Sequence, residues 1–142
     1  MITKLEHVAL SVSNLDRSLS FYRDVIGFEF IRFIDCPAEG HLGYVVGIEK
    51  CSARIAQLQL GQCILELFEY HDPRGKEISH EHNQADLGFT HMGFTSTDMA
   101  TDHARLKDNG VEFVNDPIEY RSGVWVCYFY GPDREVCELR QA

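Results

Sequence analysis

The apolar and polar positions near the N-terminus predict a strand followed by an amphipathic helix. Residues 7–12 are apolar and partly β-branched, which is typical of a buried strand. Apolar residues then recur at helical spacing over residues 15–26, so one face of the predicted helix is apolar. Asn14 is placed to cap this helix, because its side-chain oxygen can accept an unpaired amide of the first turn, and Gly27 supplies the left-handed residue that ends it.

The rest of the chain predicts more strands and a second helix. Strands over 28–34, 54–60 and 63–70 complete a β-α-β-β-β module, and the turn Gly61-Gln62 joins the last two in a hairpin. Residues 35–53 read as irregular, with a short strand expected at 44–46. A second module is expected from a strand at 90–95, a helix at 99–109 that Asp98 caps, and strands at 111–114, 124–130 and 135–140.

An internal duplication relates the two modules. His7 and His91 open the two copies at an offset of 84 residues, and matching strands that carry Glu66 and Glu138 close them. A repeat of this length that occurs only twice predicts a pseudo-symmetric domain rather than a solenoid. We therefore predict an α+β fold with two four-stranded sheets in a single domain, built from module one (1–70), a polar linker (71–88) and module two (89–142).

Composition and charge narrow the class of protein. The chain has 142 residues and a net charge of −9, which opposes nucleic-acid binding, because that function requires a concentrated basic face. No apolar run reaches the ~20 residues that cross a bilayer, and the N-terminus has no apolar signal core. The five cysteines form no Cys-x-x-Cys pair, so we expect a cytoplasmic protein whose thiols are mostly small buried groups.

The repeated His and Glu positions predict a metal site. Residues two apart in a strand share a face, so the first and last strand of each module can present a histidine and a glutamate to one cleft. Glu66 and Glu138 are flanked by apolar residues, where an ionised carboxylate is rare unless it is paired or coordinated. Two imidazoles and two carboxylates, His7, Glu66, His91 and Glu138, suit Ni, Zn, Co, Mn or Fe(II). The alternative is that each histidine is only a hydrogen-bonded structural residue.

Two long motifs resemble a known family. The segment 7–27, which contains His-Val-Ala-Leu-Ser-Val-x-Asn-Leu, and the segment 131–139, Gly-Pro-Asp-Arg-Glu-Val-Cys-Glu-Leu, resemble the vicinal oxygen chelate superfamily of glyoxalases, bleomycin-resistance proteins and dioxygenases. The resemblance covers essentially the whole chain and is closest to glyoxalase I-like proteins. It implies paired βαβββ modules that form a half-barrel cleft around a metal, and a homodimer. It also places the family's metal ligands on His7, Glu66, His91 and Glu138.

The resemblance implies a metal-dependent enzyme. A filled His-Glu-His-Glu pattern is similar to glyoxalase I, a lyase, and to related epimerases, which move a proton next to a carbonyl of a small substrate that chelates the metal. Either Glu66 or Glu138 can serve as the catalytic base. The alternatives are an Fe(II) extradiol-type dioxygenase, which would not need Glu66, and a non-catalytic small-molecule binding or resistance protein of the same fold.

Some positions depart from the glyoxalase I pattern or stand outside it. Ser11 and Tyr70 replace an Arg and an Asn that resemble glutathione-binding positions, which argues against glutathione hemithioacetal as the substrate. Arg121 is expected to be a solvated loop residue, with a substrate-anion contact as the alternative. Cys63 and Cys137 are expected to serve in packing, and the histidines of the linker, His71, His80 and His82, are expected to be solvent-exposed.

Overall fold

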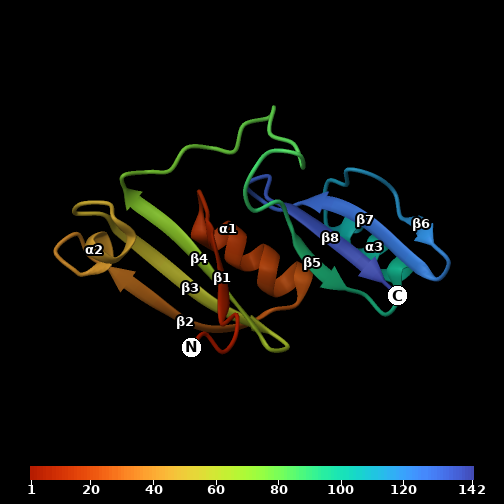
Figure 1. The fold of residues 1–142 in the computed structure, drawn as a ribbon, viewed down its shortest axis with the longest axis horizontal. Coiled ribbons are helices and arrows are strands. Elements are labelled where there is room, and N and C mark those ends of the chain that lie inside the picture. The colour runs from red at the N-terminus through yellow and green to blue at the C-terminus, as the bar shows by residue number, and fades with distance from the viewer. The chain divides into compact units, whose positions relative to one another are not determined.

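The computed structural model describes all residues 1–142, which form two compact units, residues 1–77 and 78–142. Each unit contains one four-stranded mixed sheet with a helix packed on it (Figure 1). The predicted α+β class with two tandem modules is confirmed. None of the helices has the length and apolarity needed to cross a bilayer.

In the first unit the first strand of the module pairs with the last. The strands are β1 (His7–Ser11), β2 (Glu29–Cys36), β3 (Ser52–Leu60) and β4 (Cys63–Asp72), and their order in the sheet is β1-β4-β3-β2. β1 runs parallel to β4, whereas β3 is antiparallel to both of its neighbours. The helices are α1 (Leu15–Ser20), its π-helical continuation η1 (Phe21–Ile26) and α2 (Leu42–Val46).

The second unit repeats this topology. Its strands are β5 (Met92–Thr95), β6 (Ile118–Arg121), β7 (Val124–Tyr130) and β8 (Val136–Gln141), in the order β5-β8-β7-β6. β5 is parallel to β8, and α3 (Met99–Asp108) follows β5 as α1 follows β1. The duplication in the sequence is therefore a duplication of strand order.

The helix starts form as their sequences predict. The Asn14 side chain accepts a hydrogen bond from the Arg17 amide at 2.9 Å, and the Asp98 side chain accepts one from the Thr101 amide at 3.1 Å. Gly27 adopts the left-handed conformation with φ 108°, which ends the first helical segment. Helices α1 and α3 are thus each held by a local hydrogen bond at the N-terminus.

A second bond ties each helix start to the last strand of its module. The Leu15 amide donates to the Glu69 carboxylate at 2.6 Å, and the Met99 amide donates to the Gln141 side-chain oxygen at 2.6 Å. Glu69 and Gln141 each stand three residues after the repeated glutamate of their strand. This contact anchors the helix to the strand that carries the candidate ligand.

The strand expected at 44–46 is wrong, because these residues belong to helix α2. Gly47 ends this short helix with φ 73° and donates its amide to the Gly43 carbonyl. The chain folds back so tightly that a Cβ atom on Gly43 would lie 2.6 Å from the Ile48 carbonyl oxygen. The apolar residues 44–46 therefore form a helical turn, because Gly43 and Gly47 allow the chain to fold back on itself.

The strand expected at 111–114 is also wrong. Only Phe113 forms an isolated bridge there, with Phe129, and the edge strand β6 begins at Ile118. Between them the Asn115 side-chain oxygen accepts from the Tyr128 amide at 3.3 Å, and Pro117 has no amide to donate. A side chain thus replaces a backbone group, which interrupts pairing along this edge.

Alternation along the central strands separates a core face from a face available for chemistry. On β4, Leu65 and Leu67 are fully buried beneath α1, whereas Glu66 points to the opposite face. On β8, Cys137 and Leu139 are buried and Glu138 lies on the other face. The two candidate glutamates are therefore backed by the packed cores of their units.

Replacing Leu67 by alanine should destabilise the protein by about 2–5 kcal/mol, because the side chain is 0% exposed and its removal leaves a cavity. Urea unfolding followed by circular dichroism measures this change. The control is Leu60→Ala in the same sheet, where the side chain is 38% exposed and the expected change is within about 0.5 kcal/mol. Equal losses for the two variants would contradict the assignment of the core.

The cysteines divide by burial. All five are free thiols; Cys51, Cys127 and Cys137 are buried, and Cys36 is partly buried. Desolvation raises the pKa of Cys127 to about 11, with smaller contributions from the charges of Asp116 and Glu138. Cys63 is exposed, so the packing role predicted for it is wrong; it is the first residue of β4, next to the Gly61-Gln62 turn.

Alkylation should therefore begin at Cys63 in the folded protein. At about pH 8 a thiol with a pKa near 11 is only about one part in a thousand thiolate, so Cys127 should remain unmodified until the protein unfolds. Iodoacetamide labelling followed by peptide mass spectrometry, with and without urea, measures this order. Labelling of Cys127 in the native protein as fast as that of Cys63 would contradict the burial described above.

Candidate functional site

In the first unit His7 and Glu66 meet across the parallel pair of strands. Ala9 is the register partner of Glu66 and Ile64 is the partner of His7, so the two side chains are diagonal neighbours on one face. His7 Nε2 lies 3.7 Å from Glu66 Oε2, and the two side chains are 44% and 14% exposed. The first predicted pair of ligands is thus brought together by the β1–β4 pairing.

The second unit brings His91 and Glu138 together in the same way. Gly93 is the register partner of Glu138, and His91 Nε2 lies 3.1 Å from Glu138 Oε2. A Cβ atom on Gly93 would meet the same carboxylate oxygen at 3.7 Å, so the carboxylate lies directly over this glycine. The corresponding residue beneath Glu66 is Ala9.

In both histidines the other ring nitrogen has an acceptor. His7 Nδ1 lies 2.5 Å from the Glu6 carboxylate, and His91 Nδ1 lies 3.2 Å from Gln84 Oε1 and 3.1 Å from Thr90 Oγ1. A proton held on Nδ1 by such a contact leaves the Nε2 lone pair available for a metal. Nε2 is the atom that faces the glutamate in each unit.

The surroundings of His7 also affect its charge. The hydrogen bond with Glu6 raises the pKa of His7; slight desolvation opposes this rise, and the negative charge of Glu66 adds to it. In the other unit, desolvation raises the pKa of Tyr128, whose ring contacts His91 edge to face, and the charges of Glu138 and Tyr120 add to this rise. Tyr128 therefore keeps its hydroxyl proton and is a hydrogen-bond donor at neutral pH.

The two glutamates differ in how firmly they are held. Gln57 Nε2 donates to Glu66 Oε1 at 2.5 Å, and Arg32 Nε donates to Gln57 Oε1 at 2.7 Å. The residue opposite Glu138 is Tyr128 rather than a glutamine, and the contact with His91 is the one polar side-chain contact of Glu138. Glu66 is thus fixed by a chain of hydrogen bonds, and Glu138 is freer to move.

The donor atoms fit a divalent metal. Donor atoms about 2.0–2.2 Å from a tetrahedral metal lie about 3.3–3.6 Å from one another. The 3.1 Å of the second pair is slightly shorter than this range, and the 3.7 Å of the first pair is slightly longer. Neither unit gathers three or more His, Cys, Asp or Glu side chains that could hold a metal ion by themselves. Each unit therefore offers half of the donor set that the sequence predicts.

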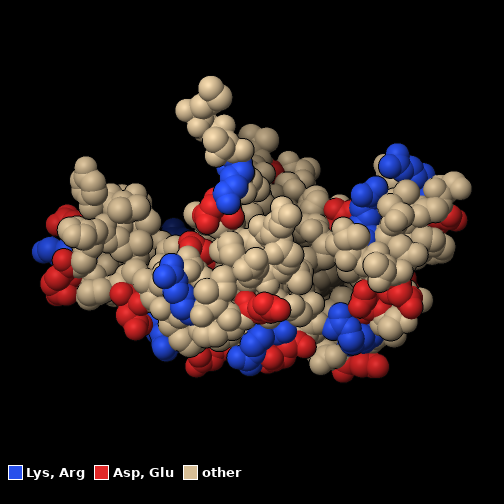
Figure 2. All heavy atoms as spheres, turned by 90° about the horizontal axis from the view of Figure 1, so that it is seen from below, with Lys and Arg blue, Asp and Glu red and all other residues tan.

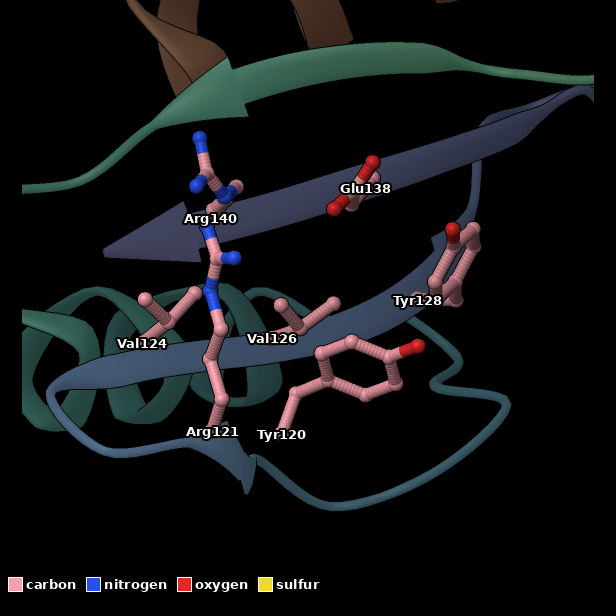
Figure 3. Close-up of a pocket in the computed structure, with 7 residues that line it drawn as sticks. All are labelled: Tyr120, Arg121, Val124, Val126, Tyr128, Glu138 and Arg140. Carbon is pink, nitrogen blue, oxygen red and sulfur yellow. The ribbon is translucent and has the colours of Figure 1, made fainter. Parts of the chain in front are cut away.

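A pocket adjoins Glu138 in the second unit. It has a volume of about 430 Å³ and opens on the face of the sheet opposite α3 (Figure 3). Seven residues line it: Tyr120, Arg121, Val124, Val126, Tyr128, Glu138 and Arg140. The arginine side chains lie toward one end of the pocket, and Glu138 and Tyr128 lie toward the other (Figure 3). The pocket therefore combines apolar surface with a carboxylate and two cations.

Sequence reasoning did not identify Gln57 or Arg140 as parts of the site. Gln57 could have been found from the hairpin turn, because residues equidistant from Gly61-Gln62 pair with one another, and this pairs Gln57 with Glu66. Arg140 stands two residues after Glu138 and shares its strand face, but only the folded sheet shows that this face borders a pocket. Arg121, expected to be a solvated loop residue, lies at the end of β6 and lines the pocket.

Comparison with known proteins identifies relatives over the whole chain. A family model for the Glyoxalase/Bleomycin resistance protein/Dioxygenase superfamily matches residues 4–139. The chain is 31% identical over 139 residues to the 2-epi-5-epi-valiolone epimerase of Actinomyces sp., a match that covers 90% of this chain and 73% of that protein. It is 26% identical over 138 residues to the probable lactoylglutathione lyase of Synechocystis sp., covering 96% and 94% of the two chains.

Solved structures share the fold. A glyoxalase family protein from Bacillus cereus superposes with a TM-score of 0.89 at 23% identity, covering 99% of this chain and 95% of that one. The fosfomycin resistance protein FosX from Listeria monocytogenes, solved in complex with Mn(II) and sulfate, superposes with a TM-score of 0.67 at 17% identity, covering 100% and 94%.

Proposed function

Because the chain belongs to the Glyoxalase/Bleomycin resistance protein/Dioxygenase superfamily, we propose that it is a divalent-metal-dependent lyase or isomerase that acts on a small molecule. The observation that carries this proposal is the repeated contact between a histidine Nε2 and a glutamate carboxylate, at 3.7 Å in one unit and 3.1 Å in the other. Relatives named as an epimerase and as a probable lyase support an enzymatic role.

We propose that His7, Glu66, His91 and Glu138 together hold one metal ion, with one imidazole and one carboxylate from each unit. The donor set suits Ni, Zn, Co, Mn or Fe(II). A cation bound there would stabilise negative charge that develops on substrate oxygens when a neighbouring carbon loses a proton. Glu6, Gln84 and Gln57 would orient the ligands through the hydrogen bonds described above.

Glu138 is the proposed base. Its carboxylate has His91 as its polar side-chain contact and borders the pocket, so it can move to a carbon atom of a molecule bound there. Glu66 is the proposed permanent ligand, because Gln57 holds one of its oxygens and His7 faces the other. In this scheme Glu138 takes the proton from the carbon beside a carbonyl and returns it to the neighbouring carbon or to the opposite face.

The family resemblance also suggests an oligomeric state, a cellular location and a class of substrate. We propose that the protein works as a homodimer in the cytoplasm and binds a small-molecule substrate with vicinal oxygens. The net charge of −9 supports a function without nucleic acid.

Purified, untagged protein should contain about one divalent metal ion per chain. The His91→Ala and Glu138→Gln variants should lose most of it, because each removes a donor from a set that needs both units. Elemental analysis of the gel-filtered protein measures the metal. The matched control is His82→Ala, which changes a partly exposed loop histidine paired with Asp86 and should keep the full metal content.

A mixing experiment tests which chains supply the ligands. One double variant lacks His7 and Glu66, and the other lacks His91 and Glu138. If a site takes its two halves from two subunits, a heterodimer of these variants regains one intact site and binds metal. If one chain supplies all four ligands, the mixture stays empty. About two metal ions per wild-type chain, or none after reconstitution, would contradict the shared four-ligand site.

The wild-type enzyme should exchange a substrate proton with solvent. In heavy water, turnover of a metal-chelating hydroxy-ketone should place deuterium on the carbon beside the carbonyl, and 2-epi-5-epi-valiolone and the glutathione hemithioacetal of methylglyoxal are the first compounds to test. Glu138→Gln should slow the exchange by about 10² to 10⁴-fold at saturating metal, because the general base is lost. Nuclear magnetic resonance of the recovered compound measures the exchange.

The control for this experiment is Glu81→Gln, which makes the same chemical change at an exposed loop position and should leave the exchange rate unchanged. Oxygen uptake with a catechol and an iron-loaded protein, retained in Glu66→Ala, would instead identify a dioxygenase. If the metal-free protein binds a compound tightly and no proton of that compound exchanges with solvent, the protein is a binding protein rather than an enzyme.

A further inference from the structure

Two arginines in the pocket beside Glu138 have no acidic partner. Arg121 and Arg140 take part in no ion pair and no side-chain hydrogen bond, although the chain has 22 acidic residues against 13 basic ones. Four of the other seven arginines are paired with acids: Arg23 with Asp24, Arg54 with Asp35, Arg105 with Asp102 and Arg134 with Glu112. On the face drawn in Figure 2, Lys and Arg side chains are scattered among acidic ones.

The strand register explains how the two guanidinium groups come together. Arg140 is opposite Val126 on β7, and Arg121 on β6 is opposite Val124 on the same strand. The two side chains therefore come from the strands on either side of β7, beside the Val124–Val126 surface. Figure 3 shows Arg121 extending across β7 toward Arg140, so that both arginines lie at the same end of the pocket. Two like charges that line one pocket repel one another, so the arrangement favours an anion beside them.

We infer that Arg121 and Arg140 bind an anionic group of the substrate, a carboxylate or a phosphate, while the reacting carbon lies at Glu138. This inference rests on the proposed function for its placement of the reacting carbon. Guanidinium groups present planar pairs of donors that match carboxylate and phosphate oxygens. An anion held by both would have more donors than a single arginine supplies.

The position of the arginines sets the shape of the substrate. Arg140 follows Glu138 by two residues on one strand, a spacing of about 7 Å along the sheet. Val124, Val126 and the exposed ring of Tyr120 line the pocket with apolar surface for the part of the molecule in between. The negative charge of Glu138 disfavours an anion at its own end of the pocket, so the charged group lies at the arginine end. The substrate is therefore an acid or a phosphate ester whose charge is several bonds from the reacting carbonyl.

Anion binding can be tested without metal or turnover. Metal-free wild-type protein is titrated with inorganic phosphate and, separately, with acetate at low ionic strength, because salt screens these contacts. Binding is followed by calorimetry and by the arginine Nε–H signals in ¹⁵N-labelled protein. Arg121→Gln and Arg140→Gln should each weaken binding of the preferred anion by about tenfold or more.

Matched variants distinguish specific binding by the two arginines from a general effect of positive charge. Lys107→Gln removes one positive charge from the exposed surface of α3, outside the pocket, and should leave anion binding within about twofold of the wild-type value. Arg121→Lys keeps the charge but not the paired donors, and should restore only part of the affinity. All of these variants should keep the wild-type metal content, because neither arginine is a proposed ligand.

The results identify which anion the pocket prefers, and they test the anion site and the proposed metal enzyme separately. Preference for phosphate over acetate would identify a phosphorylated substrate, and comparable binding would identify a carboxylic acid; both support the inference. If neither anion binds at tens of millimolar, or if Lys107→Gln weakens binding as much as the arginine variants do, the inference is overturned. Arginine-dependent anion binding in a protein that never takes up metal would leave this site standing and refute the proposed metal enzyme.

Discussion

The parallel pairing of the first and last strands of each module is the constraint on which the candidate site depends. β1 hydrogen-bonds to β4 and β5 to β8, although about 60 residues separate the first pair and about 45 the second. Only this pairing puts a histidine at the start of one strand beside a glutamate in the middle of the other. The same strands carry Glu69 and Gln141, which hold the helix starts, so the contact that forms the site also orients the helix behind it.

Duplication has produced two halves that share a frame and differ in chemistry. The residue opposite the glutamate is Gln57 in one unit and Tyr128 in the other, and the residue beside it on the parallel strand is Ala9 in one unit and Gly93 in the other. The first half holds its carboxylate with a donor chain that reaches back to Arg32. In the second half the carboxylate has one polar side-chain contact, with His91, and borders a pocket. In the proposed scheme, this difference makes Glu66 the permanent metal ligand and Glu138 the base.

The inferred anion site shows how a protein with a net charge of −9 could bind an acidic molecule. Net charge acts over long distances and is screened by salt, whereas Arg121 and Arg140 act at contact distance within a lined cavity. Glu138 lies at the other end of the same cavity, so a substrate that satisfies the arginines has its orientation fixed along the strand (Figure 3). In this proposal, substrate recognition by the arginines and proton transfer by Glu138 take place at opposite ends of one pocket.

The sequence alone determined the local features: the helix caps at Asn14 and Asp98, the Gly61-Gln62 hairpin, the alternation of core and exposed faces, and the repeated His and Glu positions. These depend on neighbouring residues or on strand periodicity, which the sequence carries directly. Only the tertiary structure decided that residues 42–46 form a helix, that the edge strand begins at Ile118, and that Arg121 and Arg140 share a pocket. The helix forms because Gly43 lies against the Ile48 carbonyl and Gly47 adopts the left-handed conformation, which the apolar run does not indicate. The edge strand and the pocket depend on register between neighbouring strands and on which edge groups find partners. A local pattern does not encode these contacts, because each one requires residues of different strands to meet.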